Sequence, residues 1–370
     1  MKEMTPAPET CMSGIERIGL TLRSLYESYG YAHFKMSKFE EYDLYAANKD
    51  FLPSDGIITF TDRRGNLLAL KPDITLSIIK NSADGKTAKY YYNENVYRTK
   101  SGSDTYGELL QLGVECIGRI GIFETAETVI MAVRSLAAVS ESYVLDISHM
   151  GLLGDVLSHG DLTDSDKRLL FKCVAEKSAH GISSADVSDD VKKALTTLIV
   201  TEGPLPYAIT ELKRRLPDFV GKDAVAELES LSTILSEAGY ADRVRLDFSV
   251  VHDRTYYNGI VMRGFIEGIP ERVLSGGRYD LLLNRMGKRG GGIGFSVYAD
   301  TLDRLVPKKR RRVTDVLVLV NNDDYAATLL SEAEKLRKTG LVVAVAESAE
   351  GIEYERLMRL VNGKLTEVTE

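Results

Sequence analysis

The segment Tyr97–Gly118 holds the polar side chains whose spacing most clearly suggests a binding site. Its sequence, YRTKSGSDTYGELLQLGVECIG, predicts a β-strand, a long polar loop and a second β-strand. In the second strand Gln111 and Glu115 share a face with Gly113, which leaves a gap between an amide and a carboxylate that are about 13 Å apart. Such a face fits the floor of a pocket for a small polar ligand with a cationic group. The more ordinary interpretation is a sheet edge whose polar side meets water.

Other residue types that often do chemistry are present, but they lack the spacing of a known site. The glycine-rich runs GGRYD and GGGIGF match neither the dinucleotide pattern nor the phosphate-loop pattern, so we expect them to let strands approach a ligand or each other closely. The five histidines have no metal-ligand spacing, and His149 and His252 are interpreted as hydrogen-bonded structural residues. The spacing predicts no metal site and no nucleophilic triad.

The composition is typical of a globular protein with a sizeable core. The 370 residues are 44% hydrophobic and 27% charged, and this length predicts two or three domains. A net charge of −7 argues against a nucleic-acid partner. Three widely spaced cysteines form no disulfide framework, and no run has the length of a membrane span or the pattern of a signal peptide. We therefore expect a cytoplasmic protein.

Hydrophobic periodicity predicts an α+β fold in which helices flank a mixed, mostly antiparallel sheet. Helical spacing predicts helices over 13–29 and 124–138. Strand patterns cover residues 31–36, a hairpin at 57–70, and residues 88–98, 109–117, 143–147, 244–251 and 256–265. Between two of these strands, Lys71-Pro72-Asp73-Ile74-Thr75 opens a helix, and Asp73 or Thr75 could serve simply as a helix-start residue.

Composition also divides the chain into parts. Residues 160–238 predict a helical insertion with charged faces, in which a short run at Leu198–Val200 is the one strand-like signal. The basic run over 307–312 predicts a linker after a core that spans 1–306. The remaining residues, 313–370, predict a small C-terminal α/β unit of the βαβ type.

The order of motifs resembles the core of histidyl-tRNA synthetase, a class II aminoacyl-tRNA synthetase. The resemblance covers about residues 10–305. The segment Tyr97–Gly118 resembles motif 2 of that family, and GGGIGFSVYADTLDRL resembles motif 3. Three further segments resemble other motifs of the family, namely KPDIT, DRTYYNGIVMRGF and LSGGRYDLLL. The resemblance implies the class II synthetase fold and a pocket for histidine. The ligand-binding residues that it implies are Asp73 and Thr75 at the amino group, Gln111 and Glu115 at other polar atoms, and Tyr257 and Tyr279 at the imidazole.

The departures from that family concern the arginines that hold ATP. The resemblance places His252 where the synthetase has an arginine at the activated carboxylate, and Thr301 where motif 3 has an arginine on the phosphates. The later arginines of motif 2 fall on Thr105 and Gly107, so that Arg98 remains as a possible anion contact. Threonine and glycine cannot offset the charge that develops on the α-phosphate, so we expect no adenylation.

LALKPDITLSI and LDISHMGLL resemble the regulatory subunits of ATP phosphoribosyltransferase, a paralogous family. This resemblance implies a protein without catalytic residues, metal or cofactor, which activates a short-form catalytic subunit in the first step of L-histidine biosynthesis and mediates histidine feedback. It also implies a homodimer within a hetero-octamer. The homodimer would form through the motif 1 region, which the resemblance places around Ser37 and Glu40. Two alternatives stay open: a divergent histidyl-tRNA synthetase, and a histidine-binding sensor with another partner.

Overall fold

The computed structural model describes residues 12–52, 56–99, 105–251, 256–302, 314–320 and 326–368. The chain divides into two compact units, Met1–Val306 and Pro307–Glu370, and each is described by itself. His252, which the sequence suggested as a structural histidine, lies outside the described residues. Within the described ranges, no helix is long and apolar enough to cross a membrane.

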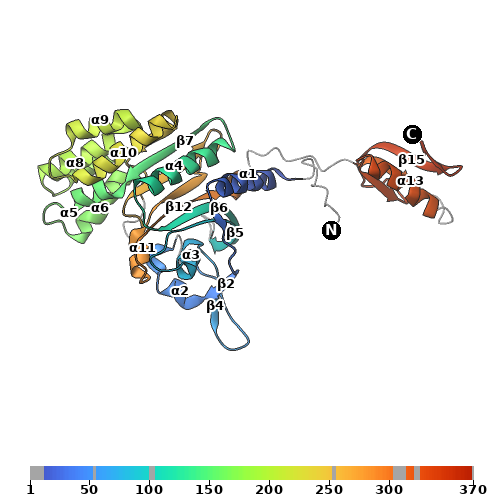
Figure 1. Ribbon diagram of the computed structural model, residues 1–370, viewed down its shortest axis with the longest axis horizontal. Coiled ribbons are helices and arrows are strands. Elements are labelled where there is room, and N and C mark those ends of the chain that lie inside the picture. Colours follow the sequence, from blue (N-terminus) through green and yellow to red (C-terminus); the bar gives the residue numbers. More distant parts are fainter. Residues whose placement is uncertain are drawn as a thin grey trace. The chain divides into compact units, whose positions relative to one another are not determined.

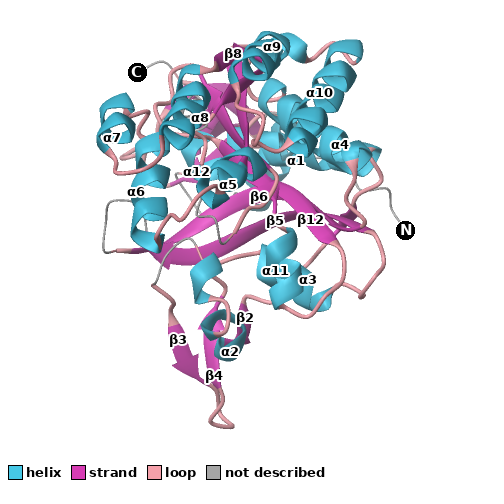
Figure 2. Ribbon diagram, turned by 90° about the vertical axis from the view of Figure 1, so that its left-hand side faces the viewer, coloured by secondary structure: helices cyan, strands magenta, loops and turns pink. Residues whose placement is uncertain are grey.

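A nine-stranded sheet forms the centre of the first unit (Figures 1 and 2). Its strands, in spatial order, are β1 (Ala32–His33), β5 (Ala88–Thr99), β6 (Tyr106–Gly118), β12 (Gly291–Tyr298), β11 (Leu274–Arg278), β10 (Ile260–Ile266), β7 (Tyr143–His149), β9 (Val244–Asp247) and β8 (Glu202–Pro204). Two pairs, β1 with β5 and β7 with β9, are parallel, and the other pairs are antiparallel. The predicted mixed, mostly antiparallel sheet is therefore confirmed.

Helices cover both faces of this sheet. On one face, α1 (Gly14–Ser28) and α4 (Ile122–Ala137) belong to a core that includes Leu112, Val114 and Cys116 of β6. On the other face lie α3 (Thr75–Asn81) and α11 (Asp280–Arg285), as Figure 2 shows. A capping box fixes the start of α1, because Ser13 and Glu16 each accept a hydrogen bond from the other's backbone N–H.

Strand β6 lies inside the sheet, so its interpretation as a water-facing edge is wrong. It pairs with β5 on one side and with β12 on the other. Each residue from Gln111 to Gly118 is buried. The alternation of β6 was correctly predicted, but the covering of its polar face depends on elements far away in the sequence.

A helical layer follows β7 and contains the predicted insertion. Its helices are α5 (Met150–Ser158), α6 (Asp164–Ala175), α7 (Ala179–Ser184), α8 (Asp189–Val200), α9 (Leu205–Arg215) and α10 (Lys222–Glu237). The strand-like run Leu198–Val200 is in fact the last turn of α8, and the strand β8 begins two residues later, at Glu202. A short apolar run does not distinguish a strand from a buried helix face, which explains the wrong assignment.

A small three-stranded sheet leads the chain into the site. Its strands are β2 (Phe39–Glu41), β3 (Thr59–Thr61) and β4 (Leu67–Leu70), and α2 (Tyr42–Ala46) follows β2. The predicted hairpin turn is closed by Asp62, whose Oδ1 accepts hydrogen bonds from the backbone N–H groups of Arg64 and Asn66. Short helices complete the unit at Lys49–Phe51, Ala241–Arg243 and α12 (Ala299–Leu302).

The second unit is a four-stranded sheet with one helix among its described residues. Its elements are β13 (Thr314–Leu319), α13 (Ala326–Lys338), β14 (Val343–Ala346), β15 (Tyr354–Val361) and β16 (Lys364–Glu367). The parallel pair β13 and β14, joined through α13, is the βαβ arrangement that the sequence predicts. The hairpin of β15 and β16 was not predicted, although its turn, Asn362-Gly363, is a strong hairpin signal and both residues have positive φ.

Candidate functional site

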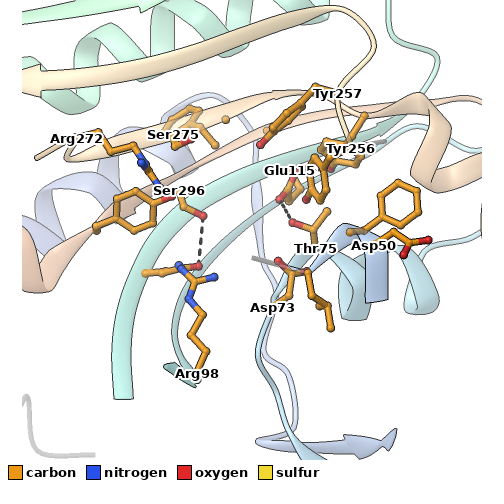
Figure 3. A pocket seen from close by; sticks show the side chains of 18 residues that line it. Asp50, Asp73, Thr75, Arg98, Glu115, Tyr256, Tyr257, Arg272, Ser275 and Ser296 are labelled. Atoms are coloured by element: carbon orange, nitrogen blue, oxygen red, sulfur yellow. Dashed lines mark hydrogen bonds between the residues drawn. The ribbon is translucent and has the colours of Figure 1, made fainter. Parts of the chain in front are cut away.

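A pocket of about 190 Å³ opens over the sheet face that carries Glu115 (Figure 3). It is lined by all seven residues that were selected from the sequence, namely Asp73, Thr75, Arg98, Gln111, Glu115, Tyr257 and Tyr279. These residues come from β5, β6, the start of α3, the segment before β10 and the residue before α11. The fold therefore brings together side chains that are spread over more than half of the first unit.

The sheet face under the pocket carries small residues that the strand register places side by side, and Gly294, Ser275 and Ser296 among them line the pocket. Directly paired residues of neighbouring strands share a face. One row across the sheet is Glu115, Gly294 and Gly277, and the next row on the same face is Gly113, Ser296 and Ser275. A Cβ atom at Gly294 would lie 1.9 Å from Oε2 of Glu115, so glycine leaves the space that the carboxyl group occupies. The expectation that the glycine-rich runs permit close approach is thus confirmed.

Two hydroxyl groups hold the carboxyl group of Glu115 in this floor. Thr75 Oγ1 donates to Oε1 at 2.8 Å, and the hydroxyl group of Tyr279 donates to Oε2. The side chain is only 3% exposed, and burial raises its pKa to about 8. At neutral pH the group therefore holds a proton, and a cationic group of a ligand would favour its ionised form.

Asp73 both starts a helix and lines the pocket. Its Oδ1 accepts a hydrogen bond from the backbone N–H of Leu76 at 2.9 Å, which is the helix-start contact that the sequence left as an alternative. Burial raises the pKa of Asp73, while nearby Arg98 opposes this shift. The preceding Lys71 is itself buried and forms a 2.5 Å ion pair with Glu94 of β5, which ties the segment between β4 and α3 to the large sheet.

Two arginines also line the pocket. Figure 3 shows Arg98 and Arg272 on either side of Ser296. Ser296 Oγ donates to Oε1 of Gln111 at 3.5 Å. The pocket thus combines carboxyl groups with guanidinium groups, which suits a small zwitterion.

The residues selected from the sequence leave out several side chains of this pocket, among them Tyr256, Arg272 and Ser296. The ring of Tyr256 lies 4.5 Å from that of Tyr257 and 6.0 Å from that of Tyr279, so the three tyrosines form one aromatic wall. The doubled tyrosine of the YYN motif was a signal for Tyr256. Ser296 follows from the register with Gly113, but no sequence pattern points to Arg272, which lies in the connection between β10 and β11.

Comparison with known proteins identifies the family to which the chain belongs. A family model described as histidyl-tRNA synthetase matches residues 7–302. The chain belongs to the histidyl-tRNA synthetase family. A curated relative from Bacillus mycoides, named ATP phosphoribosyltransferase regulatory subunit, is 25% identical over 339 residues, which are 87% of this chain and 79% of the relative.

Solved structures support the same fold. A Bacillus halodurans protein described as an ATP phosphoribosyltransferase regulatory subunit/histidyl-tRNA synthetase has a TM-score of 0.78 and 23% identity, covering 98% of this chain and 99% of its own. A chain of an ATP phosphoribosyl transferase complex from Thermotoga maritima has a TM-score of 0.61 and 18% identity, covering 77% of this chain and 97% of its own. The predicted class II synthetase fold is therefore confirmed.

Positions assigned to ATP-binding arginines in the histidyl-tRNA synthetase family carry other residues here. Thr301 lies in α12, Thr105 directly precedes β6, and Gly107 lies at the start of that strand. In the described ranges, no group of three or more His, Cys, Asp or Glu side chains could hold a metal ion. His149 is hydrogen-bonded, as predicted: its Nδ1 accepts from the backbone N–H of Gly151, and its Nε2 lies 3.1 Å from Oε2 of Glu227.

Proposed function

We propose that this chain is a non-catalytic regulatory subunit of ATP phosphoribosyltransferase, the enzyme of the first step of L-histidine biosynthesis. One observation carries the proposal: a pocket lined by all the residues that the resemblance implies for histidine is combined with Thr105, Gly107 and Thr301 at the positions of the ATP-binding arginines. Relatives with the name ATP phosphoribosyltransferase regulatory subunit align with 87–90% of the chain, which supports the same role.

L-Histidine is the ligand that we propose for the pocket. Its ammonium group would meet Asp73 and Thr75, and its imidazole ring would lie between the tyrosine wall and Glu115. A carboxyl group that exchanges its proton near neutral pH can either donate to or accept from an imidazole nitrogen, which fixes one tautomer. The three tyrosines close the apolar sides of the ring, as expected for a pocket with few polar contacts.

Catalysis would then take place on the partner subunit. Attack on the α-phosphate of ATP builds negative charge that a synthetase must offset with fixed cations. Threonine and glycine supply no such cation at the three described positions. The short-form catalytic subunit would carry the phosphoribosyl transfer, and this chain would need neither metal nor cofactor.

Regulation would act through assembly in the cytoplasm. We propose that the chain forms a homodimer through the motif 1 region and joins the catalytic subunit in a hetero-octamer. The relative from Thermotoga maritima was solved as part of an ATP phosphoribosyl transferase complex, which supports a catalytic partner. Histidine would inhibit by binding one state of this assembly more tightly than the other, because a ligand shifts an equilibrium only through differential affinity.

Mixing this protein with the short-form catalytic subunit of the same organism tests the proposal. The mixture should elute as one complex in size-exclusion chromatography, and transferase activity should rise by roughly 5- to 150-fold, the usual range of allosteric coupling. Histidine should then lower the activity of the mixture and have little effect on the catalytic subunit alone. Separate elution at micromolar concentration with unchanged activity would refute the assignment and favour a histidine sensor with another partner.

A matched pair of variants locates the feedback site. Glu115→Ala should reduce the response of the complex to histidine, because it removes the buried carboxyl group from the pocket. Glu108→Ala, on the exposed part of the same strand, should leave that response unchanged. If both variants respond to histidine like the unmodified protein, the feedback site lies elsewhere, for example at a subunit interface.

A further inference from the structure

Arg272 stands at the mouth of the pocket, although no motif assigns it a role. It lies in the connection between β10 and β11 and is exposed, with its guanidinium carbon 6.0 Å from the centre of the Tyr298 ring. Together with Arg98, at the end of β5, it borders Ser296 (Figure 3). Among the described residues, neither of these two arginines forms an ion pair with a carboxylate.

A third arginine makes this side of the pocket more strongly cationic. Arg263 of β10 pairs directly with Ser275 on the pocket face of the sheet, and one of its terminal nitrogens donates to the carbonyl oxygen of Val251 at 2.7 Å. Burial lowers the pKa of Arg263, and the positive charge of Arg272 lowers it further. Its Nε is buried without a hydrogen-bond partner among the described residues. An anion at the pocket mouth would relieve this repulsion.

The distance between Glu115 and Ser296 fits one amino acid. Ser296 is two residues along β12 from Gly294, the direct partner of Glu115, which corresponds to about 7 Å along the strand. An imidazole group placed at Glu115 would therefore put the α-carboxylate of the same molecule near Ser296. Guanidinium groups bind carboxylates through paired, charge-assisted hydrogen bonds, and two of them border this position.

We propose that Arg272, together with Arg98, binds the α-carboxylate of the ligand, so that the pocket selects the free amino acid over the amine that lacks this group. The inference rests on the proposed histidine-binding role of the pocket. Arg272 would take over the carboxylate contact that the resemblance assigns to the arginine replaced by His252. A regulatory pocket of this kind would respond to the free amino acid and not to related imidazole amines.

Calorimetry with two ligands and two proteins tests the inference. L-Histidine and histamine differ by the carboxylate alone. The ratio of their affinities therefore measures how much the protein's contacts to the carboxylate strengthen binding. The unmodified full-length protein should bind L-histidine more tightly than histamine. Arg272→Gln should weaken L-histidine binding by roughly 10-fold, near the lower end for a charge-assisted hydrogen bond at an exposed site. Its affinity for histamine should change by less than about 3-fold.

Controls separate the possible outcomes. Arg119→Gln removes the same charge from an exposed position outside the pocket and should change neither affinity. Arg272→Lys should restore part of the preference for L-histidine. An unchanged histidine-to-histamine ratio in Arg272→Gln would refute the role of Arg272 alone and leave the proposed function standing. Absence of L-histidine binding to the unmodified protein would refute the proposed ligand of the pocket together with the role of Arg272. The regulatory role itself is tested separately, by assembly with the catalytic subunit.

Discussion

Replacing Glu115 with glutamine should change how the stability of the protein depends on pH. Burial raises the pKa of this carboxyl group from 4.5 to about 8. Between these two values the folded protein holds a proton that the unfolded chain has already released. The stability that the folded protein gains from holding this proton on Glu115 is therefore fully present below pH 4.5 and is lost progressively as the pH rises towards 8.

The size of the effect follows from this window. Each pH unit between the two pKa values lowers the free energy of unfolding by about 1.4 kcal/mol. The free energy of unfolding should therefore fall by roughly 3–4 kcal/mol between pH 5 and pH 8. This loss is a large part of the ~5–15 kcal/mol that keeps a typical protein folded. A glutamine side chain has nearly the shape of the protonated carboxyl group and can accept a hydrogen bond from Thr75 or Tyr279, but it cannot ionise.

Urea denaturation followed by circular dichroism would measure the effect at several pH values between 5 and 8. Glu115→Gln should become more stable than the unmodified protein by roughly 3–4 kcal/mol over this range, relative to their difference at pH 5. Other titrating groups, such as Asp146 with its pKa raised to about 6 by burial, are present in both proteins and cancel in the comparison. Glu108→Gln, exposed on the same strand, should show no such divergence. Parallel pH profiles for Glu115→Gln and the unmodified protein would refute the reasoning.

Four further outcomes are expected. Glu115→Ala should weaken L-histidine binding by about 1.5–3 kcal/mol in calorimetry, the range for a hydrogen bond to a charged group, and unchanged affinity would move the site elsewhere. Gly294→Ala should lower stability by about 1–3 kcal/mol because its Cβ meets Glu115 and the β6 backbone. Gly154→Ala in α5, where nothing lies within 4 Å, should instead raise it by up to about 1 kcal/mol, and equal changes in Tm would contradict the packing argument. The protein alone should not catalyse histidine-dependent exchange of pyrophosphate into ATP, because Thr301 supplies no charge; exchange with kcat on the order of 1 s⁻¹ would contradict this.

Local sequence patterns predicted the strands and residue faces of the site, but they did not predict which elements surround them. The period of two in β6 placed Gln111, Gly113 and Glu115 on one face, and the structure has them on the pocket face. The same pattern could not show that β12 lies beside β6 or that α11 lies over this face, because contacts between distant segments leave no trace in a short window. The resemblance to a synthetase family supplied that missing long-range information.

Side chains that reach the pocket from irregular connections were the hardest to predict. Arg272 lies outside regular structure, and its approach to Ser296 depends on how the connection between β10 and β11 is laid over the sheet. The local pattern also misled at Leu198–Val200, where three successive apolar residues at the end of a helix look like a short strand. The turn Asn362-Gly363 shows the opposite case, a readable hairpin signal that was overlooked.

The pairing of β6 with β12 has a consequence for the synthesis of the chain. Strand β6 ends at Gly118, and the neighbour that completes the pocket begins only at Gly291. The helices α6 to α9 contact their neighbours along the chain and can form early, whereas closing so long a loop is slow. On the ribosome, the growing chain therefore carries β6 with an unpaired edge until almost the whole first unit has emerged, and such edges promote aggregation. We expect a nascent chain that stops before Gly291 to fold its helical layer, to remain unable to bind ligand, and to depend on chaperones.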